Sequence, residues 1–293
     1  MPYSKINARK GGLKMATIID GKELARKTRE NLKIDCENLK KNGIKPKLAV
    51  IMVGDNPASK VYVKNKSKAC EEVGIEYEEF LLEENTTQEK LINLIEELNN
   101  REDITAILLQ SPIPNHLDIN EAFRTISPKK DVDGFHPVNV GKLALGQDTF
   151  VSCTPYGVIK MFEEYNINLE GKDVVIIGRS NIVGKPLIQC CLNKNATVTV
   201  CHSRTKNLAE HTKRADIVIV AIGKAKFLKE DMVKEGAVVI DVGINRGEDG
   251  KLCGDVDFEN VSRKASYITP VPGGVGPMTI AMLMNNVIKA AKA

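Results

Sequence analysis

Short apolar runs alternate regularly with helix-like stretches through the second half of the chain, and this alternation restricts the fold more than any other feature. The strand candidates lie at residues 173–177, 197–201, 216–222 and 237–242. Helix-like stretches separate them, for example at residues 183–193 and 206–214. Strands this uniformly apolar are typical of a parallel sheet that helices cover on both faces. The second half is therefore predicted to be a doubly wound α/β domain.

The first half carries the same kind of pattern. Residues 48–53 and 104–109 are predicted as buried strands, and residues 20–40 as an amphipathic helix. Between the strands, residues 88–99 have apolar positions on one helical face. A length of 293 residues also favours two domains over one. The predicted fold class is α/β, with two α/β domains flanking a cleft.

The domain limits follow from where the patterns change. Residues 1–14, which carry basic and no acidic side chains, are predicted as a flexible extension, with a transit peptide as the alternative. Residues 15–150 are assigned to the first domain and residues 151–276 to the second. The final helix, residues 277–293, follows a turn rich in proline and glycine and is assigned to the first domain. Pro277 suits the first position of that helix.

A glycine loop, Gly178-Arg-Ser-Asn-Ile-Val-Gly184, follows a predicted strand and opens a predicted helix. In this position glycines allow a tight turn and let backbone N–H groups approach a pyrophosphate near the helix N-terminus. Ser180 and Val183 occupy the positions of the second and third glycines of the usual dinucleotide motif, so the spacing alone is weak. A plain strand-to-helix turn is the alternative. The context favours dinucleotide binding, with Gly178, Arg179, Ser180 and Gly184 as the contacting residues.

The end of the next strand distinguishes NAD from NADP. Many NAD-binding folds place an acid there against the ribose, whereas this chain reads Cys201-His-Ser-Arg-Thr205. Ser203 and Arg204, with Arg179 nearby, could hold a 2′-phosphate through charge-assisted hydrogen bonds. A solvated basic loop would need no ligand. NADP is the predicted cofactor.

Composition excludes several classes of function. The net charge is only +4 and there is no tryptophan, which argues against a nucleic-acid partner. No apolar run is long enough to cross a membrane. The seven cysteines form no C-x-x-C pair and the four histidines show no ligand spacing, so neither a disulfide framework nor a metal site is predicted. Reduced thiols indicate a cytoplasmic protein.

Several polar residues in the first half are candidates for a functional site. Tyr62 and Lys66 share a helix face, although a solvated lysine face would look the same. Gln110 ends a strand, where ligands bind in α/β sheets. Asp131 and Asp133 stand two residues apart before a glycine, and a structural Asx-turn is the alternative for either acid.

Five segments, in this order, resemble those of the bifunctional methylenetetrahydrofolate dehydrogenase/methenyltetrahydrofolate cyclohydrolase family, and the resemblance runs from about Met15 to the C-terminus. They are VGDNPASKVYVKNKSKACEEVGI, KDVDGFHPVNVGKL, CTPYGVIKMF, GRSNIVGKPL and TPVPGGVGPMTIAML. The family usually has Q-L-P-L-P where this chain reads Gln110-Ser-Pro-Ile-Pro, so Ser111 is a departure.

The resemblance implies a Rossmann-like second domain and assigns roles to particular residues. Lys66 matches the catalytic lysine, Tyr62 and Gln110 match residues that orient the lysine and contact the substrate, and Asp133 matches the residue that anchors the pterin ring. Pro272 and Gly273 match backbone that contacts folate. Ser59 has two interpretations, a site residue or a helix cap. Ile244 is included with the cofactor-binding residues. The implied partners are tetrahydrofolate derivatives and a second copy of the chain.

The implied chemistry is oxidation of 5,10-methylenetetrahydrofolate with NADP, followed by hydrolysis of the methenyl product to 10-formyltetrahydrofolate. A shikimate- or amino-acid-type dehydrogenase shares the two-domain plan and a first-domain lysine, so it stays open as an alternative. A dinucleotide-sensing binding protein without catalytic activity is a further alternative. The motifs KDVDGFHP and PVPGGVGPMT favour the folate enzyme.

Overall fold

The computed structural model describes residues 15–247 and 250–293, so the extension predicted for residues 1–14 lies outside the described part. The chain divides into two compact units. The first unit comprises residues 25–153 and 280–293, and the second comprises residues 15–24 and 154–279. Each unit contains a parallel sheet, which confirms the predicted α/β class. None of the described helices is long and apolar enough to span a membrane.

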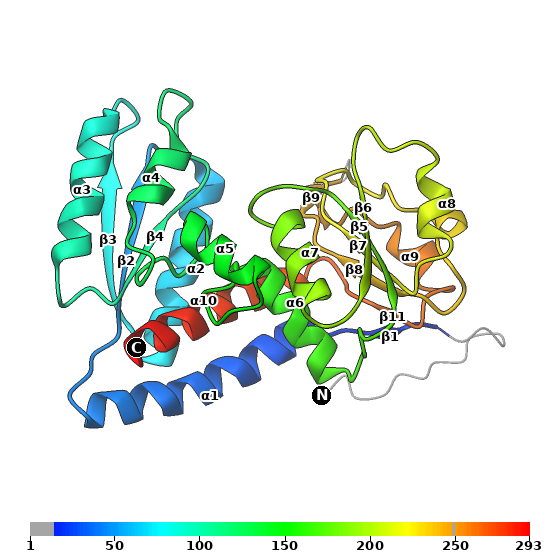
Figure 1. Ribbon diagram of the computed structural model, residues 1–293, viewed down its shortest axis with the longest axis horizontal. Coiled ribbons are helices and arrows are strands. Elements are labelled where there is room, and N and C mark those ends of the chain that lie inside the picture. Colours follow the sequence, from blue (N-terminus) through cyan, green and yellow to red (C-terminus); the bar gives the residue numbers. More distant parts are fainter. Residues whose placement is uncertain (1–14, 248–249) are drawn as a thin grey trace. The chain divides into compact units, whose positions relative to one another are not determined.

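The sheet of the first unit has three parallel strands in the order β3-β2-β4 (Figure 1). Its strands are β2 (Lys47–Val53), β3 (Glu76–Leu82) and β4 (Ala106–Leu109). Its helices are α2 (Pro57–Val73), α3 (Gln88–Asn100), α4 (Ile119–Thr125), α5 (Pro137–Ala144) and most of α1 (Gly21–Lys41). Alternate residues of β2 pack with α3 and α4 in one apolar core.

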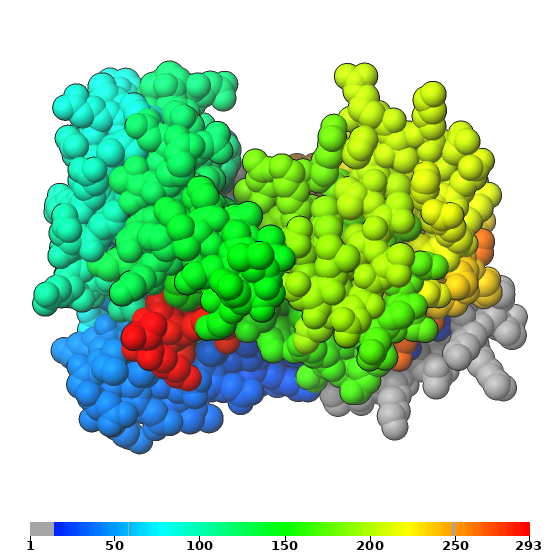
Figure 2. Space-filling model, viewed as in Figure 1, coloured from blue at the N-terminus to red at the C-terminus, as the bar shows by residue number. Residues whose placement is uncertain are grey.

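The opposite face of this sheet lies against α2. The last helix, α10 (Val275–Ala291), packs beside α2, where the thiol of Cys70 lies 3.6 Å from the sulfur of Met284. Residues 281–284 are buried, whereas the C-terminal end of α10, red in Figure 2, reaches the surface beside α1. The segment that contains Asp131 joins the same sheet, because Ile107 and Asp131 form a parallel bridge next to β4.

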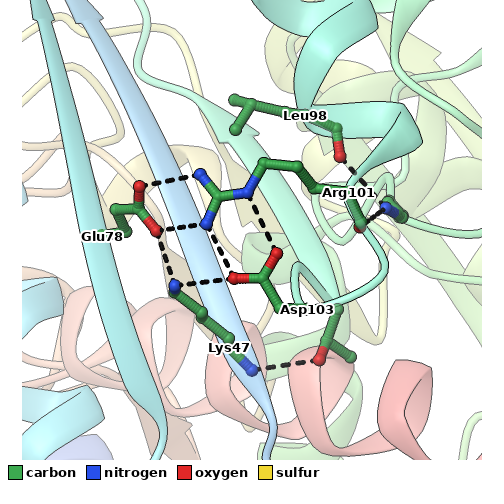
Figure 3. A network of polar contacts seen from close by, with 7 residues as sticks. Lys47, Glu78, Leu98, Arg101 and Asp103 are labelled. Atoms are coloured by element: carbon green, nitrogen blue, oxygen red, sulfur yellow. Dashed lines mark hydrogen bonds and ion pairs between the residues drawn. The ribbon is translucent and has the colours of Figure 1, made fainter.

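A charge network holds the amino end of this sheet (Figure 3). Arg101 donates two hydrogen bonds to the two oxygens of Glu78, both 2.8 Å long, and also pairs with Asp103. Lys47 bridges the same two carboxylates. The network therefore ties the beginning of β2 to β3 and to the end of α3. It lies at the edge of the sheet opposite to the carboxyl ends of the strands.

Acid is expected to weaken this network in a defined pH range. Its cations lower the pKa of Glu78 from 4.5 to about 2, mainly through hydrogen bonds from Arg101 and Lys47. A carboxyl group whose pKa is lowered on folding stabilises the fold above its unfolded pKa and loses that contribution as the pH falls toward the folded pKa. We expect Glu78→Gln to flatten the pH dependence of the urea midpoint between pH 4.5 and about 2.

The exposed Glu76, on the same strand, is the control, and Glu76→Gln should leave that slope unchanged. An identical slope for wild type and Glu78→Gln would contradict the assigned role of Glu78.

The second unit contains a six-stranded parallel sheet in the order β1-β11-β8-β7-β5-β6 (Figure 1). Its strands are β1 (Thr17–Ile18), β5 (Asp173–Ile177), β6 (Thr197–Cys201), β7 (Ile217–Val220), β8 (Val238–Asp241) and β11 (Tyr267–Ile268). A short antiparallel pair, β9 (Asn245–Arg246) and β10 (Leu252–Cys253), extends from it. The remaining helices are α6 (Cys153–Glu164), α7 (Gly184–Leu192), α8 (Leu208–Thr212), η1 (Glu230–Met232) and α9 (Phe258–Val261).

This sheet has the doubly wound arrangement expected from the sequence. The chain runs from β5 outward to β6 and then returns to place β7 on the other side of β5. One face packs against residues of α8, η1 and α9 in a single apolar core, and α7 packs against β5 and β6. The change of direction between β5 and β7 creates the kind of switch point where open α/β sheets bind ligands.

Two details differ from the sequence-based expectations. Strand β3, with the sequence EYEEFLL, lies at a sheet edge, and its acidic residues conceal it from a search for apolar runs. Helix α10 begins at Val275, so Pro277 occupies its third position rather than its first. A proline is tolerated there because the N–H groups of a first helical turn have no partner within the helix.

Candidate functional site

Lys66 and Gln110 meet in the first unit, as the resemblance to the folate enzymes implies. Lys66 lies on α2 and Gln110 directly follows β4. The amine of Lys66 donates a 2.8 Å hydrogen bond to Oε1 of Gln110. The other end of the Gln110 amide, Nε2, donates to the carbonyl oxygen of Ser111 at 2.6 Å. This second bond fixes the orientation of the amide, so that its oxygen faces the lysine.

Asp133 lies close to the same lysine and contacts a thiol. Cys153, at the beginning of α6, donates a 3.4 Å hydrogen bond through Sγ to Oδ1 of Asp133. This contact occupies only one of the two carboxylate oxygens. The other oxygen can still accept from N–H donors of a ligand.

Asp131 has a structural role, in contrast to Asp133. Its carboxylate accepts hydrogen bonds from the backbone of Phe135 and His136 and from the amide of Asn139. Asp131 is buried, at 2% exposed. The carboxylate of Asp131 thus bonds to the backbone four and five residues further on rather than two, so it forms no Asx-turn, but its role is structural and it orients the loop on which Asp133 lies.

Burial changes the acid–base properties of this cluster. It lowers the pKa of Lys66, and the nearby negative charge of Asp133 partly offsets the effect. Burial likewise raises the pKa of Asp133, and the positive charge of Lys66 opposes that rise. A lysine whose pKa is lowered exists more often as the neutral amine, which can accept a proton. The cluster therefore places a lysine with a lowered pKa beside a carboxylate, an arrangement suited to general-base chemistry, and the catalytic role of Lys66 stays a prediction.

Two neighbours of Lys66 on α2 differ in their surroundings. Tyr62, one turn earlier, is 41% exposed and presents an aromatic ring at the surface of the first unit. The cap interpretation of Ser59 is wrong, since the side-chain oxygen of Asn56 accepts from the backbone N–H of Ser59 at 3.1 Å. The hydroxyl of Ser59 is buried and has no hydrogen-bond partner among the described residues.

Pro272 and Gly273 belong to the second unit, where they form the turn before α10. The φ of Gly273 is +101°, a conformation that favours glycine, and its carbonyl oxygen accepts from the backbone N–H of Lys22 at 2.9 Å. Pro272 is exposed. Their contact with folate remains a prediction.

The glycine loop of the second unit has the geometry of a dinucleotide cradle. Gly178 has a φ of +123°, and a Cβ atom there would collide with the carbonyl oxygen of Ala221. A Cβ on Gly184 would collide with the backbone of Gly178. The hydroxyl of Ser180 accepts from the backbone N–H groups of Val183 and Gly184 at 3.2 and 3.3 Å. The loop is therefore compact, follows β5 directly and lies at the beginning of α7, the position at which dinucleotide folds bind a pyrophosphate, and its contact with the cofactor stays a prediction.

The other predicted cofactor residues surround the same edge of the sheet. Arg179 is exposed in the glycine loop, and Ser203 and Arg204 are exposed after β6, the neighbour of β5. Ile244 follows β8 and is 48% exposed. All four lie at or beyond the carboxyl ends of parallel strands, where nucleotides bind in this kind of sheet.

Two further residues, Cys153 and Asn286, are neighbours of this cluster that the sequence did not predict. Asn286, on α10, donates through Nδ2 to the carbonyl oxygens of Val132 and Val151 at 2.8 and 3.0 Å. It therefore links the Asp133 loop to the segment before Cys153. A signal for Cys153 is present in the sequence, because this residue begins the CTPYG segment, which resembles the family. Asn286 carries no comparable signal in a mostly apolar helix.

Comparison with known proteins identifies the family. Residues 19–133 match the catalytic domain of tetrahydrofolate dehydrogenase/cyclohydrolase, and residues 152–293 match the NAD(P)-binding domain of the same family. The bifunctional protein FolD of Bacillus subtilis is 56% identical over 277 residues, which cover 94% of this chain and 98% of the relative.

Solved structures agree with this result. The FolD methylenetetrahydrofolate dehydrogenase/cyclohydrolase of Campylobacter jejuni is 56% identical and has a TM-score of 0.94, with 94% of this chain and 99% of that chain covered. The Trypanosoma brucei enzyme, solved with NADP and an inhibitor, is 36% identical with a TM-score of 0.91, and covers 95% and 98%. A shikimate dehydrogenase of Thermus thermophilus is only 13% identical with a TM-score of 0.52, which shows a shared fold alone. The chain belongs to the tetrahydrofolate dehydrogenase/cyclohydrolase family.

Proposed function

We propose that the chain oxidises 5,10-methylenetetrahydrofolate to the 5,10-methenyl form with NADP, and then hydrolyses this product to 10-formyltetrahydrofolate. The observation that carries the proposal is the cluster of Lys66, Gln110 and Asp133 in a chain that also contains an NAD(P)-binding domain of this family. Tyr62, Lys66, Gln110 and Asp133 lie in the first unit, whereas the dinucleotide loop, Pro272 and Gly273 lie in the second.

The two reactions make different demands on the protein. NADP, when bound, accepts the hydride from the methylene carbon. The folate nitrogens stabilise the resulting cation, so that this step chiefly requires the reacting atoms to be held in position. We assign Asp133 to the pterin N–H donors, because the carboxylate has an oxygen that Cys153 leaves available. Tyr62 provides an exposed ring against which the folate can stack.

Hydrolysis requires proton transfer at the bound cation. Water adds to the methenyl carbon and releases a proton, and the neutral amine of Lys66 takes up this proton. The oxygen of Gln110 accepts from the Lys66 amine and so holds the lysine in one orientation. A nitrogen–carbon bond of the five-membered ring then breaks, and the nitrogen accepts a proton as 10-formyltetrahydrofolate forms. Lys66 thus serves as the base in a site that also binds a cation, which itself disfavours a charged lysine.

The preference for NADP rests on Arg179, Ser203 and Arg204. These exposed residues surround the carboxyl ends of β5 and β6, and no acidic residue occurs between Cys201 and Thr205. An acid at this position would repel a 2′-phosphate, whereas guanidinium groups attract it.

We also propose a cytoplasmic homodimer. The seven cysteines are free thiols, which is usual in a reducing compartment. Strand β6 pairs only with β5 among the described strands, and Val198 and Val200 on it are only partly buried. An apolar strand at a free sheet edge is suited to pairing with a second copy. Light scattering would test this, because a mass near 32.2 kDa would indicate a monomer.

The choice between folate and shikimate as substrate is tested directly by turnover. We expect reduction of NADP with 5,10-methylenetetrahydrofolate and none above background with shikimate, because the first-unit cluster matches the folate family. Hydrolysis of supplied 5,10-methenyltetrahydrofolate is measured in parallel. Turnover of shikimate without turnover of either folate would establish the alternative dehydrogenase. An absence of both folate reactions, with NADP still bound, would favour a binding protein without catalytic activity.

A further inference from the structure

Asp255 is a fully buried carboxylate that the proposed mechanism does not use. It lies just after β10, at 0% exposed, and all of its recorded partners are N–H donors. Oδ2 accepts from the backbone of Ile222 and Gly223 at 2.7 and 3.0 Å. Oδ1 accepts from the backbone of Lys224 at 2.7 Å and from the side-chain amide of Asn245 at 2.9 Å. Three successive backbone N–H groups are thus held by one side chain.

A second buried carboxylate, Asp241, holds Asp255 in place. Asp241 ends β8 and accepts from the backbone N–H groups of Asp255 and Val256, both at 2.9 Å. It also accepts from the backbone N–H of Gly243 at 3.0 Å. A Cβ atom on Gly243 would collide with the carboxylate of Asp255, so the two segments are in close contact. The position of the Asp255 side chain is therefore fixed by β8.

The residues held by Asp255 lead directly to the glycine loop. Ile222 and Gly223 follow β7, and the carbonyl oxygen of Ala221, just before them, lies against Gly178. Strands β5 and β7 are neighbours in the sheet, and the chain changes direction between them. This is the edge at which the pyrophosphate of a dinucleotide is expected. Asp255 thus supports the surface against which the glycine loop packs.

Asp255 also acts on the loop after β8. Asn245, which donates to Oδ1 of Asp255, immediately follows Ile244 in the chain. Ile244 is 48% exposed and is one of the predicted cofactor contacts. One carboxylate therefore fixes the loops that follow β7 and β8, although none of its recorded hydrogen bonds involves Gly178, Arg179 or Ile244.

We propose that Asp255 is a positioning residue for the dinucleotide, and that it sets the affinity for NADP by holding the residue 221–224 loop and Asn245 at the carboxyl ends of β7 and β8. The proposal rests on the proposed function in so far as NADP is the ligand. It predicts that loss of the Asp255 charge weakens binding of the dinucleotide while the folate chemistry of the first unit continues.

The test compares Asp255→Asn with wild type in two measurements. Titration calorimetry gives the dissociation constant for NADP, and hydrolysis of supplied 5,10-methenyltetrahydrofolate reports on Lys66, Gln110 and Asp133. The asparagine amide can accept through only one atom and presents N–H groups to backbone donors. We expect the dissociation constant to rise at least about tenfold, since each buried N–H that loses a charged acceptor is costly. Hydrolysis should change by less than about twofold, because the residues that carry it lie in the other unit.

Asp257→Asn is the matched control. Asp257 lies two residues further on, and its carboxylate accepts from the side chains of Asn260 and Lys229 rather than from the loop after β7. Its replacement should leave the affinity for NADP unchanged. An unchanged affinity in Asp255→Asn, or an equal loss in Asp257→Asn, would overturn the proposal.

If Asp255→Asn does not fold, a milder variant still tests the role of Asp255 in NADP binding. Asn245→Ala removes a single donor to Asp255 at a partly exposed position, and we expect NADP to bind several-fold more weakly with hydrolysis intact. No change in affinity, or a parallel fall in hydrolysis, would then refute the role of Asp255. Failure of wild type to bind NADP would instead contradict the proposed function.

Discussion

Replacement of Lys66 by glutamine is expected to lower the rate of methenyltetrahydrofolate hydrolysis by a factor between about 10² and 10⁴, the range typical of general acid–base catalysis. The amine donates to Oε1 of Gln110, and burial lowers its pKa, so that it can act as the base. A glutamine side chain retains polarity but cannot take up the proton. Titration with NADP should give the wild-type affinity, because the dinucleotide loop lies in the second unit.

The control for this variant is Lys64→Gln. Lys64 is exposed on the same helix and lies outside the cluster, so its replacement should leave both activities within about twofold of wild type. A Lys66→Gln enzyme with a full hydrolysis rate would remove Lys66 from the mechanism. An equal loss in Lys64→Gln would instead attribute the effect to the net charge of α2.

Replacement of Arg179 by alanine is expected to weaken NADP by about tenfold to a hundredfold while NAD changes little. A charge-assisted hydrogen bond to phosphate contributes roughly 1.5–3 kcal/mol, which corresponds to this range. NAD lacks the 2′-phosphate, so it cannot lose this interaction. Arg179 is exposed within the glycine loop, and its removal should leave the buried Gly178 and Gly184 undisturbed.

Lys194→Ala provides the control for general charge near α7. Lys194 lies beyond the other end of this helix, where it pairs with Glu163 at 3.0 Å. Its removal should alter neither cofactor's affinity. If Arg179→Ala weakened NADP and NAD equally, the residue would contact the common part of the dinucleotide, and the preference for NADP would need another source.

The sequence predicted the elements whose apolar patterns are strong. Strand β5, which is apolar after its first residue, matches its predicted limits, and α3 extends one residue beyond its own predicted limits. Both are predictable because buried positions show as apolar residue types. Strand β3 could not be predicted in this way, since its acidic residues face solvent or the charge network around Arg101 at a sheet edge. Which residue types a strand tolerates depends on its neighbours and on whether it lies at a sheet edge, and neither is known before the sheet is.

The candidate site likewise contains residues that the sequence could predict and residues that it could not. Lys66 and Gln110 could be named from their motifs, and the structure joins them by a hydrogen bond. Cys153 and Asp133 are twenty positions apart in the chain, and nothing in the sequence indicates that their side chains are in contact. Asp255 stands in a short segment without a recognised motif, and its role depends on backbone N–H groups that sequence patterns do not display. Site residues that act through side-chain chemistry could therefore be predicted, whereas residues that bind the backbone of loops far away in the sequence could not.

One spectroscopic time course tests the central claim most directly. The wild-type protein is mixed with 5,10-methylenetetrahydrofolate and NADP, and with NAD in a parallel sample, while the reduced cofactor and the methenyl intermediate are followed separately. We expect faster formation of reduced cofactor with NADP, accompanied by methenyltetrahydrofolate that is consumed as 10-formyltetrahydrofolate appears. Formation of neither reduced cofactor nor formyl product, from folate that an active relative converts under the same conditions, would contradict the account.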